Sequence, residues 1–391
     1  MPASPYFAGP CRELVRAANP EGLRSRNVRS LSAPTQENAV DLGIIEGFFG
    51  RPWRWAERAE AVRFLAPHGY RFFLYAPKAD PYLRRDWREP YPEANLEALA
   101  DLAGVCRAAG VRFGVGLTPY ELHFDFDAEA KAALAAKLAA LDAVGIEDLA
   151  ILFDDMRGDL PDLAARQAEI VHWVGARTHA GRLIVCPSYY SDDPILDRVF
   201  GQRPENYLAD FGAALDSAIE IMWTGEEVCS AEYSPGHLTR VAEQMGRKPF
   251  LWDNYPVNDG PRMSRHLHLR AVTGRPGAIA PLIAGHAVNP ASQAVLSRIP
   301  ALTLADSYAQ GEAYQYGEAF IRAANAVLGP ELAALVRSDL SALQDWGLDA
   351  PESRKARLLT RYAAFDHPGA REIVAWLEGA YEITGEELQT Q

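Results

Sequence analysis

The sequence is poor in positive charge relative to negative charge, and it has no long apolar run. Its 391 residues include 39 Lys and Arg against 52 Asp and Glu, which gives a formal net charge of -13 at pH 7. Binding to a phosphate backbone needs a basic surface, so this balance argues against a nucleic-acid partner. No segment offers the ~20 consecutive apolar residues that span a bilayer, and the first residues lack the basic and then apolar pattern of a secretory signal. We therefore expect no nucleic acid and no membrane among its partners.

Cysteines are also few, and the common cofactor motifs are missing. Cys11, Cys106, Cys186 and Cys229 are scattered, without the close spacing of a zinc or redox site. Cys106 and Cys186 lie among apolar residues, which favours buried free thiols over a disulfide framework. The sequence has no HExxH, no P-loop, no GxGxxG after a strand and no GxSxG elbow. We therefore expect no cofactor, no metal and a cytoplasmic location.

Short apolar runs alternate with longer amphipathic stretches from residue 41 onward. The clearest amphipathic stretch carries Leu134, Leu138 and Leu141 at i, i+4 and i+7, a helical spacing. Eight strand-and-helix repeats over roughly 250 residues are typical of a (β/α)8 TIM barrel, although a doubly wound open sheet also alternates. The eight apolar runs are Gly43–Glu46, Phe72–Tyr75, Phe113–Leu117, Leu149–Phe153, Leu183–Cys186, Ile219–Trp223, Pro249–Trp252 and Ala280–Ala284.

The two ends of the chain have a different character from its centre. Residues 1–40 are rich in Pro, Arg, Ser and Asn, and we expect them to form a partly disordered leader. Residues 311–391 show helical patterns only, at 332–346, 355–365 and 371–381. A further helix is expected at 264–271. The predicted fold is α/β: a (β/α)8 barrel over residues 41–310, followed by a smaller helical C-terminal domain.

Polar and aromatic residues collect where the expected strands end, which is where barrel enzymes carry their catalytic groups. Asp154 and Asp155 follow the fourth strand. Successive strand residues point to opposite faces, so both side chains can enter one pocket only where the chain turns. Two neighbouring carboxylates do not both ionise readily, so one can hold a proton, which suits acid-assisted cleavage of a glycosidic bond. A pair of helix N-cap residues is the alternative interpretation.

The other side chains at these strand ends each have a structural interpretation beside the functional one. Aromatic rings either fill the barrel mouth or pack on the apolar face of a sugar, and this choice is open for Trp223 and Trp252. Amides and carboxylates either form turns or bind hydroxyl groups. That second choice is open for Asn254, Asp259 and Asn289.

Five motifs carry a resemblance to a known family. They are IIEGFFGRPW from Ile44, LYAPK ending at Lys78, LFDDM around the two aspartates, MWTG ending at Gly225, and WDNYPVND ending at Asp259. In these motifs the chain resembles glycoside hydrolase family 84, the family of protein O-GlcNAcase and bacterial β-N-acetylglucosaminidases. The resemblance covers roughly residues 41–308.

The resemblance implies a retaining exo-β-N-acetylglucosaminidase that uses substrate-assisted catalysis. The 2-acetamido oxygen of the substrate would attack the anomeric carbon and give an oxazoline intermediate, a variant of the usual two-carboxylate scheme. Asp154 would hold the acetamido N–H, and Asp155 would act first as acid and then as base. The substrate-binding residues implied are Gly47, Lys78, Asp259 and Asn289 for sugar hydroxyls, Asn254 and Tyr190 for the acetamido region, and Thr224, Val228 and Trp252 for the pocket wall.

Two positions depart from the family's pattern. Tyr189 stands where members often have an acidic residue, and the resemblance assigns Tyr190 to the site in its place; Ala79 stands where an aspartate is common. From the residues alone, Lys78 could be a solvated loop lysine and Tyr190 an ordinary surface tyrosine.

Two other functions remain open at this point. One is a hyaluronidase-like glycosidase, which needs a groove beyond the first sugar subsite. The other is a non-catalytic N-acetyl-sugar-binding protein, which has no need of an acid. The expected partner is an N-acetylglucosamine-bearing glycan or glycoprotein, and a homodimer is left open.

Overall fold

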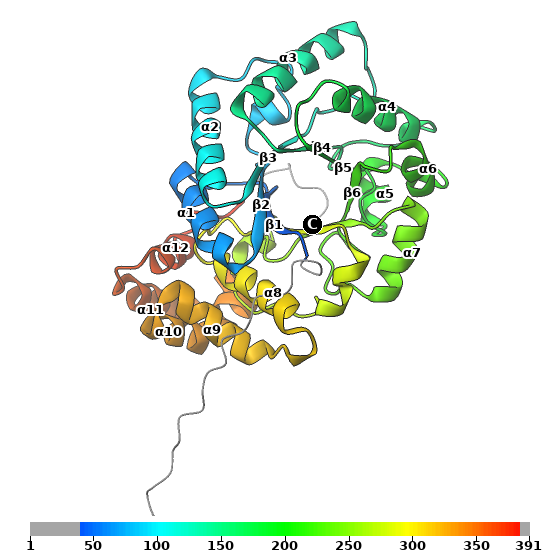
Figure 1. The fold of residues 1–391 in the computed structure, drawn as a ribbon. Helices are drawn as coiled ribbons and strands as arrows, with labels where there is room; N and C mark the ends of the chain where they lie inside the picture. The colour runs from blue at the N-terminus through cyan, green and yellow to red at the C-terminus, as the bar shows by residue number, and fades with distance from the viewer. Residues whose placement is uncertain (1–39, 384–391) are drawn as a thin grey trace, which may run out of the picture. The chain divides into compact units, whose positions relative to one another are not determined.

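Eight parallel strands close into a barrel in the computed structural model, which describes residues 40–383. Each strand pairs with its sequence neighbours, and β1 pairs with β8 (Figure 1). This confirms the (β/α)8 barrel and excludes the open sheet. The leader expected over residues 1–40 lies outside the described residues, apart from its last position. The strands are β1 Leu42–Glu46, β2 Tyr70–Tyr75, β3 Arg112–Leu117, β4 Asp148–Leu152, β5 Arg182–Cys186, β6 Glu220–Trp223, β7 Phe250–Asp253 and β8 Gly285–Val288.

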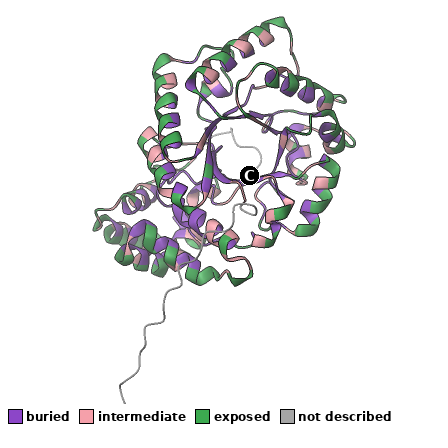
Figure 2. Ribbon diagram, viewed as in Figure 1, coloured by how far each residue is buried: buried purple, intermediate pink, exposed green. Residues whose placement is uncertain are grey.

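Helices surround the barrel, with their inner faces buried and their outer faces exposed (Figure 2). The clearest is α3, where the Asp127 side chain accepts the N–H of Ala130 at the start and Gly145, at φ 83°, ends the helix. In the described part of the chain, no helix combines the length and apolar character needed to cross a bilayer. The helices are α1 Trp55–Leu65, α2 Glu93–Ala108, α3 Ala128–Val144, α4 Leu163–Gly175, α5 Ile195–Phe200, α6 Tyr207–Ala214, α7 Pro235–Met245 and α8 Arg298–Gln310.

Strand residues alternate between the barrel interior and the layer of helices. On β4, Ala150 and Leu152 belong to the interior cluster, whereas Leu149 and Ile151 pack in the larger cluster under the helices. This is the period of two that a pleated strand imposes. Because the pattern continues to the strand ends, it decides which side chains reach the mouth of the barrel.

Charged side chains occupy the opposite end of the barrel, where the strands begin. Asp148 lies between Arg112 and Arg182, at 3.2 and 3.6 Å, and both arginines also contact Asp41 at 2.7 and 2.6 Å. The second arginine also pairs with Glu220 at 2.5 Å. The two arginines offset most of the charge of the three carboxylates, as expected of the stabilising end of such a barrel.

Four further helices gather beside α8 (Figure 1). They are α9 Tyr316–Leu328, α10 Pro330–Leu340, α11 Glu352–Ala363 and α12 Pro368–Leu377, with a π-helical turn at Ser341–Trp346. Three of the helical stretches expected here are present, and α9 was not predicted. All the described residues belong to one compact unit, and a domain boundary at residue 310 stays a prediction.

The C-terminal helices hold two loops at the mouth of the barrel. Gln344 Oε1 accepts the backbone N–H groups of Leu269 and Arg270, which follow β7, at 2.9 and 3.0 Å. Glu372 on α12 accepts the backbone N–H groups of residues 295 and 296, which follow β8, at 2.9 and 3.0 Å. These contacts support the segments that carry Asp259 and Asn289.

Two element predictions were wrong. The eighth strand is β8, not the run 280–284, which lies in a 3-10 segment, Gly277–Leu282, and the residues after it. That run is more apolar than β8, but Pro281 interrupts it, and in β8 the buried His286 is satisfied by Asp253 and Tyr308 at 3.0 and 2.7 Å. The helix expected at 264–271 is only a 3-10 turn, Met263–Arg265, because the side chain of Gln344 takes the N–H groups that a helix would use.

The cysteine prediction is confirmed where it can be checked. Cys106 and Cys186 are buried free thiols, and Cys229 is free and partly buried. Burial raises the pKa of the Cys106 thiol to about 12, so it stays protonated. Cys11 lies outside the described residues.

Candidate active site

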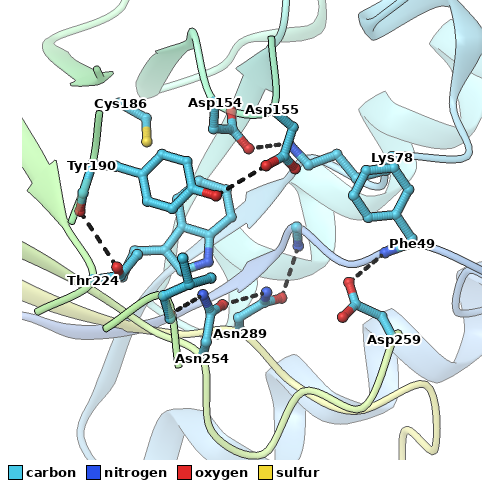
Figure 3. A pocket seen from close by; sticks show the side chains of 13 residues that line it. Phe49, Lys78, Asp154, Asp155, Cys186, Tyr190, Thr224, Asn254, Asp259 and Asn289 are labelled. Atoms are coloured by element: carbon cyan, nitrogen blue, oxygen red, sulfur yellow. Dashed lines mark hydrogen bonds and ion pairs between the residues drawn. The ribbon is translucent and has the colours of Figure 1, made fainter. Parts of the chain in front are cut away.

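A single pocket at the C-terminal ends of the strands contains every site residue predicted from the sequence (Figure 3). All eleven predicted residues are among the thirteen described residues that line it. The two that were not predicted are Phe49 and Cys186. The lining residues are Gly47, Phe49, Lys78, Asp154, Asp155, Cys186, Tyr190, Thr224, Val228, Trp252, Asn254, Asp259 and Asn289.

The two aspartates enter the pocket by different routes. Asp154 continues the inward series of β4 after Ala150 and Leu152, so alternation alone directs it to the mouth. Asp155 would point outward, but its φ of 55° places it in the left-handed region and turns it back into the same pocket. A non-glycine residue in that region costs roughly 1–2 kcal/mol, and Asp tolerates it better than most residues do. The turn that the sequence required is therefore present.

The two carboxylate oxygens of Asp154 have different surroundings. Its Oδ2 forms an ion pair with the Nζ of Lys78, and both side chains are buried. Its Oδ1 is buried and has no hydrogen-bond partner in the described part of the chain. An unmet buried acceptor is unfavourable, so this oxygen is suited to receive an N–H group from a ligand.

Asp155 lies in surroundings that favour its protonated form. Burial raises its pKa first, and the charge of Asp154 raises it further, to about 6. Lys78, a hydrogen bond from Tyr190 and the charge of Arg84 act in the opposite direction. The Tyr190 hydroxyl donates to Oδ1 of Asp155 at 2.9 Å. A carboxyl group with this pKa can donate a proton near neutral pH and take one back.

A chain of amide hydrogen bonds forms the opposite wall of the pocket (Figure 3). The N–H of Gly47 donates to Oδ1 of Asn289 at 3.2 Å, and Nδ2 of Asn289 donates to Oδ1 of Asn254 at 2.9 Å. Nδ2 of Asn254 then donates to the carbonyl oxygen of Val228 at 2.8 Å. This order fixes which atom of each amide is a donor and which is an acceptor. The turn-forming interpretation of these asparagines is therefore incomplete, because their side chains line the pocket.

The side chains of Trp223 and Trp252 lie on opposite faces of the barrel wall. Trp252 is in the interior cluster and lines the pocket, whereas Trp223 packs under the helices and donates its Nε1–H to His237 at 3.0 Å. Trp252 therefore lies where a sugar ring could pack, whereas Trp223 has a structural role under the helices and does not fill the barrel mouth. Gly47 lies against Trp252 so closely that an added Cβ would be 2.4 Å from Cζ2 of the ring. Only glycine fits this contact.

The adjacent tyrosines also have different roles. Tyr190 lines the pocket, and its carbonyl oxygen accepts the N–H of Thr224 at 2.9 Å. Tyr189 points elsewhere, because its hydroxyl donates to the carbonyl oxygen of Gly201 at 2.6 Å. The structure thus places Tyr190, and not Tyr189, at the site.

The positions of the two lining residues that were not predicted follow from their strands and contacts. Phe49 follows β1, and its N–H donates to Oδ2 of Asp259 at 2.9 Å, which ties that carboxylate to the loop. Cys186 is the last inward residue of β5 and forms part of the pocket floor. Inward alternation could have identified Cys186. The position of Phe49 depends on a partner 210 residues away.

The pocket has the chemistry of a binding site for a neutral, polar ring. It combines three carboxylates, two of which follow β4 and have unequal surroundings, with ordered amides, one paired lysine and an aromatic face. Within residues 40–383, His, Cys, Asp and Glu form no group of three that could hold a metal ion. Together these groups can orient hydroxyls, accept an amide N–H and transfer a proton.

Comparison with known proteins points to one family. Residues 42–341 match the family model described as beta-N-acetylglucosaminidase. The chain is similar to the protein O-GlcNAcase of Rattus norvegicus, at 30% identity over 329 residues, which are 76% of this chain and 35% of that protein. It is also similar to the protein O-GlcNAcase of Mus musculus, at 30% identity over 279 residues, 68% of this chain and 30% of that protein. The chain thus spans about a third of the length of these relatives.

Solved structures agree with the match. A mutant form of the O-GlcNAc hydrolase of Thermobaculum terrenum superposes with a TM-score of 0.71 at 27% identity, over 86% of this chain and 80% of that one. CpGH84B superposes with a TM-score of 0.68 at 24% identity, over 87% of this chain and 66% of that one, which supports the fold alone.

Proposed function

This chain belongs to the β-N-acetylglucosaminidase family, glycoside hydrolase family 84, and we propose that it is a retaining exo-β-N-acetylglucosaminidase of the O-GlcNAcase type. The single observation that carries the proposal is the turn after β4, which directs two carboxylates with unequal surroundings into one pocket. One is ion-paired and has an open acceptor, and the other has a pKa raised to about 6. An acetamido sugar uses both properties at once.

In the first step the substrate supplies its own nucleophile. The acetamido N–H donates to the open Oδ1 of Asp154, which orients the amide and increases the charge on its oxygen. That oxygen attacks the anomeric carbon, and the bond from this carbon to the leaving oxygen breaks. Asp155 gives its proton to the leaving oxygen, so the first step ends with an ionised Asp155 and an oxazoline still protonated on nitrogen, whose N–H stays hydrogen-bonded to the Asp154 carboxylate.

In the second step a water molecule opens the oxazoline. Asp155, now ionised, takes a proton from the water as the water oxygen attacks the anomeric carbon. The bond between this carbon and the acetamido oxygen breaks, and the acetamido group is restored. Two displacements at one carbon leave its configuration unchanged, so the product is the retained β-sugar. A pKa near 6 serves both directions of proton transfer.

The remaining residues hold one sugar ring. Gly47, Lys78, Asp259 and Asn289 bind the ring hydroxyls, because they provide donors and acceptors along one wall. Asn254 and Tyr190 lie at the acetamido region. The apolar wall that receives the acetyl methyl group and the ring face consists of Thr224, Val228 and Trp252.

The acid role of Asp155 is tested by Asp155→Asn. Asn suits the left-handed backbone at this position, so the variant should keep its fold. We expect hydrolysis of N-acetylglucosaminides with poor leaving groups to fall by about 10²–10⁴-fold. Aryl substrates with activated leaving groups need less protonation and should lose much less. Equal losses on both substrate types would contradict the acid role.

The natural substrate is tested by comparing a glycopeptide that bears N-acetylglucosamine, a chitooligosaccharide and a hyaluronan fragment. The proposal predicts the highest kcat/KM for the terminal sugar of the glycopeptide. Rates that increase with hyaluronan length would support the hyaluronidase-like alternative. No turnover of any of these or of an aryl N-acetylglucosaminide would leave a sugar-binding protein as the remaining function.

The partner that we propose is an N-acetylglucosamine-bearing glycoprotein or glycan. A cytoplasmic location and a homodimer are proposals from the sequence alone. Size measurement in solution and localisation of the tagged protein test them.

A further inference from the structure

Arg84 lies beside the turn that carries Asp155. It follows the 3-10 turn Pro81–Leu83 in the loop between β2 and α2. The loop is attached to the end of β3 at two points: Leu83 accepts the N–H of Thr118 at 2.8 Å, and Trp87 donates its Nε1–H to the carbonyl oxygen of Tyr120 at 3.3 Å. The loop therefore holds Arg84 in a defined place.

The guanidinium group of Arg84 is buried between two rings and against one backbone carbonyl. The residue is 7% exposed, and its Cζ lies 5.5 Å from the ring centroid of Phe49 and 5.1 Å from that of Tyr120. Its Nη2 is 3.5 Å from the carbonyl oxygen of Asp155. A cation over aromatic faces is attracted to them, and a buried arginine can keep its charge in this setting.

Arg84 lacks the partners that buried arginines usually have. In residues 40–383 no carboxylate lies within ion-pair distance of it, and its Nε is buried without a hydrogen-bond partner. A buried cation without a carboxylate is unfavourable for folding. The arrangement places an uncompensated positive charge next to the acid, and stability alone does not explain it.

The position of this charge matters for both proton transfers. Burial and the charge of Asp154 favour the protonated form of Asp155, which helps the first step and hinders the second. The charge of Lys78 also favours the ionised form of Asp155, but Lys78 is ion-paired with Asp154. Within residues 40–383 Arg84 has no carboxylate partner, and its charge likewise favours the ionised form.

We propose that Arg84 is a positioning residue for the acid: it supports the left-handed peptide at Asp155 and supplies a second fixed positive charge, beside that of Lys78, against the neighbouring carboxylate. The proposal rests on the proposed function, because it concerns the same acid. Arg84 does not line the pocket, so it acts through Asp155 and not on the substrate.

The experiment compares Arg84→Met and Arg84→Lys with Arg85→Met. Arg85 is the matched control, because it is adjacent, exposed and also near Tyr120, at 5.7 Å, but has no contact with Asp155 in the described residues.

The measurement is the pH profile of kcat/KM on a substrate with a poor leaving group. Loss of a positive charge raises the pKa of a nearby acid, so Arg84→Met should move the basic limb up by roughly half a pH unit or more. Arg84→Lys should keep the limb within about 0.2 pH unit of wild type, and Arg85→Met should leave it in place.

The outcomes separate this proposal from the proposed function. A wild-type enzyme without activity would refute the proposed function, whereas an active wild type with an unmoved limb in Arg84→Met would refute only the role of Arg84. An equal shift in Arg85→Met would also refute it, because any nearby charge would then suffice. If Arg84→Met does not fold, Tyr120→Leu tests the same point: release of the guanidinium should move the limb in the same direction, and an unchanged limb would overturn the proposal.

Discussion

The aspartate at the end of β7 and the aspartates after β4 occupy comparable places and have opposite properties. Asp253 accepts from Arg275 at 2.7 and 3.0 Å and contacts Nε2 of His286 at 3.0 Å. Burial would raise the pKa of Asp253, but Arg275 and His286 hold it well below its usual range. Asp154 keeps one oxygen open, and Asp155 has a raised pKa.

Asp253 and Asp154 differ because they extend opposite faces of their strands. Asp253 follows the inward Trp252 and so points to the outer side, where Arg275 also ties the loop carbonyls of Ser230 and Ala231. Asp154 continues an inward series. A carboxylate with all its oxygens satisfied stabilises the fold, whereas one with an open oxygen is available for chemistry. Four experiments test this distinction.

The largest effect is expected for Asp154→Asn. The amide cannot carry the charge that steadies the oxazoline, so kcat should fall by about 10³-fold, near 4 kcal/mol. The loss should be similar for activated and poor leaving groups, because every substrate needs the acetamido oxygen as its nucleophile, whatever the leaving group. The exposed Asp159, paired with Arg157, provides the control variant Asp159→Asn. Near-normal turnover of aryl substrates by Asp154→Asn would contradict the assignment.

The second effect is on stability. Asp253→Asn leaves Arg275 buried without its counter-charge, so the free energy of unfolding should fall by about 3 kcal/mol in denaturant titration. The exposed pair Arg270–Asp345 is the control, and Asp345→Asn should cost less than about 1 kcal/mol. Folded Asp253→Asn should retain most of its kcat. If Asp253→Asn were as stable as wild type but inactive, Asp253 would be a functional residue and not a structural one.

The third expected effect is that activity and the free energy of unfolding depend on pH in different ways. Asp155 must be protonated in the first step, so kcat/KM for poor leaving groups should fall about tenfold per unit as the pH rises above about 6. The pKa of Asp253 is lowered on folding, so its stabilisation is present above the unfolded value near 4 and is lost as the pH falls below it. Activity and unfolding free energy should thus decline at opposite ends of the pH range. A basic limb that persists unchanged in Asp155→Asn would assign the limb to another group.

The smallest effect is expected for Tyr190→Phe. Its hydroxyl stabilises the ionised form of Asp155, so its removal should raise the pKa of that carboxyl and move the basic limb up by several tenths of a unit. The rate should change by less than about tenfold, since one hydrogen bond is lost. Tyr189→Phe is the control, because that hydroxyl bonds Gly201. The distinction between the tyrosines fails if both variants shift the limb equally.

Local patterns predicted the eight strand-and-helix repeats but did not by themselves separate a closed barrel from an open sheet. The polar residues after the apolar runs meet at one end of the closed parallel sheet. The turn at Asp155 was predictable because two adjacent carboxylates cannot otherwise share a pocket. The family motifs, and not local patterns, indicated the other predicted lining residues, and neither indicated Phe49 or Cys186.

Features that depend on distant partners were not predictable. Asp253 stands in the same motif as Asn254, and only Arg275 and His286, 22 and 33 residues later, show that it is structural. The helix expected at 264–271 was lost to Gln344, a side chain about 75 residues away. The role proposed for Arg84 likewise depends on the burial of its side chain, which its sequence neighbourhood does not indicate.

The hydrogen bonds that Gln344 and Glu372 make to the loops after β7 and β8 limit how this protein can be shortened or recombined. A chimera that takes its last eighty residues from a relative would inherit new anchors for the very loops that present Asp259 and Asn289. Such an exchange should alter the preference between gluco- and galacto-configured sugars, even though no residue between 312 and 383 is among the described lining residues of the pocket.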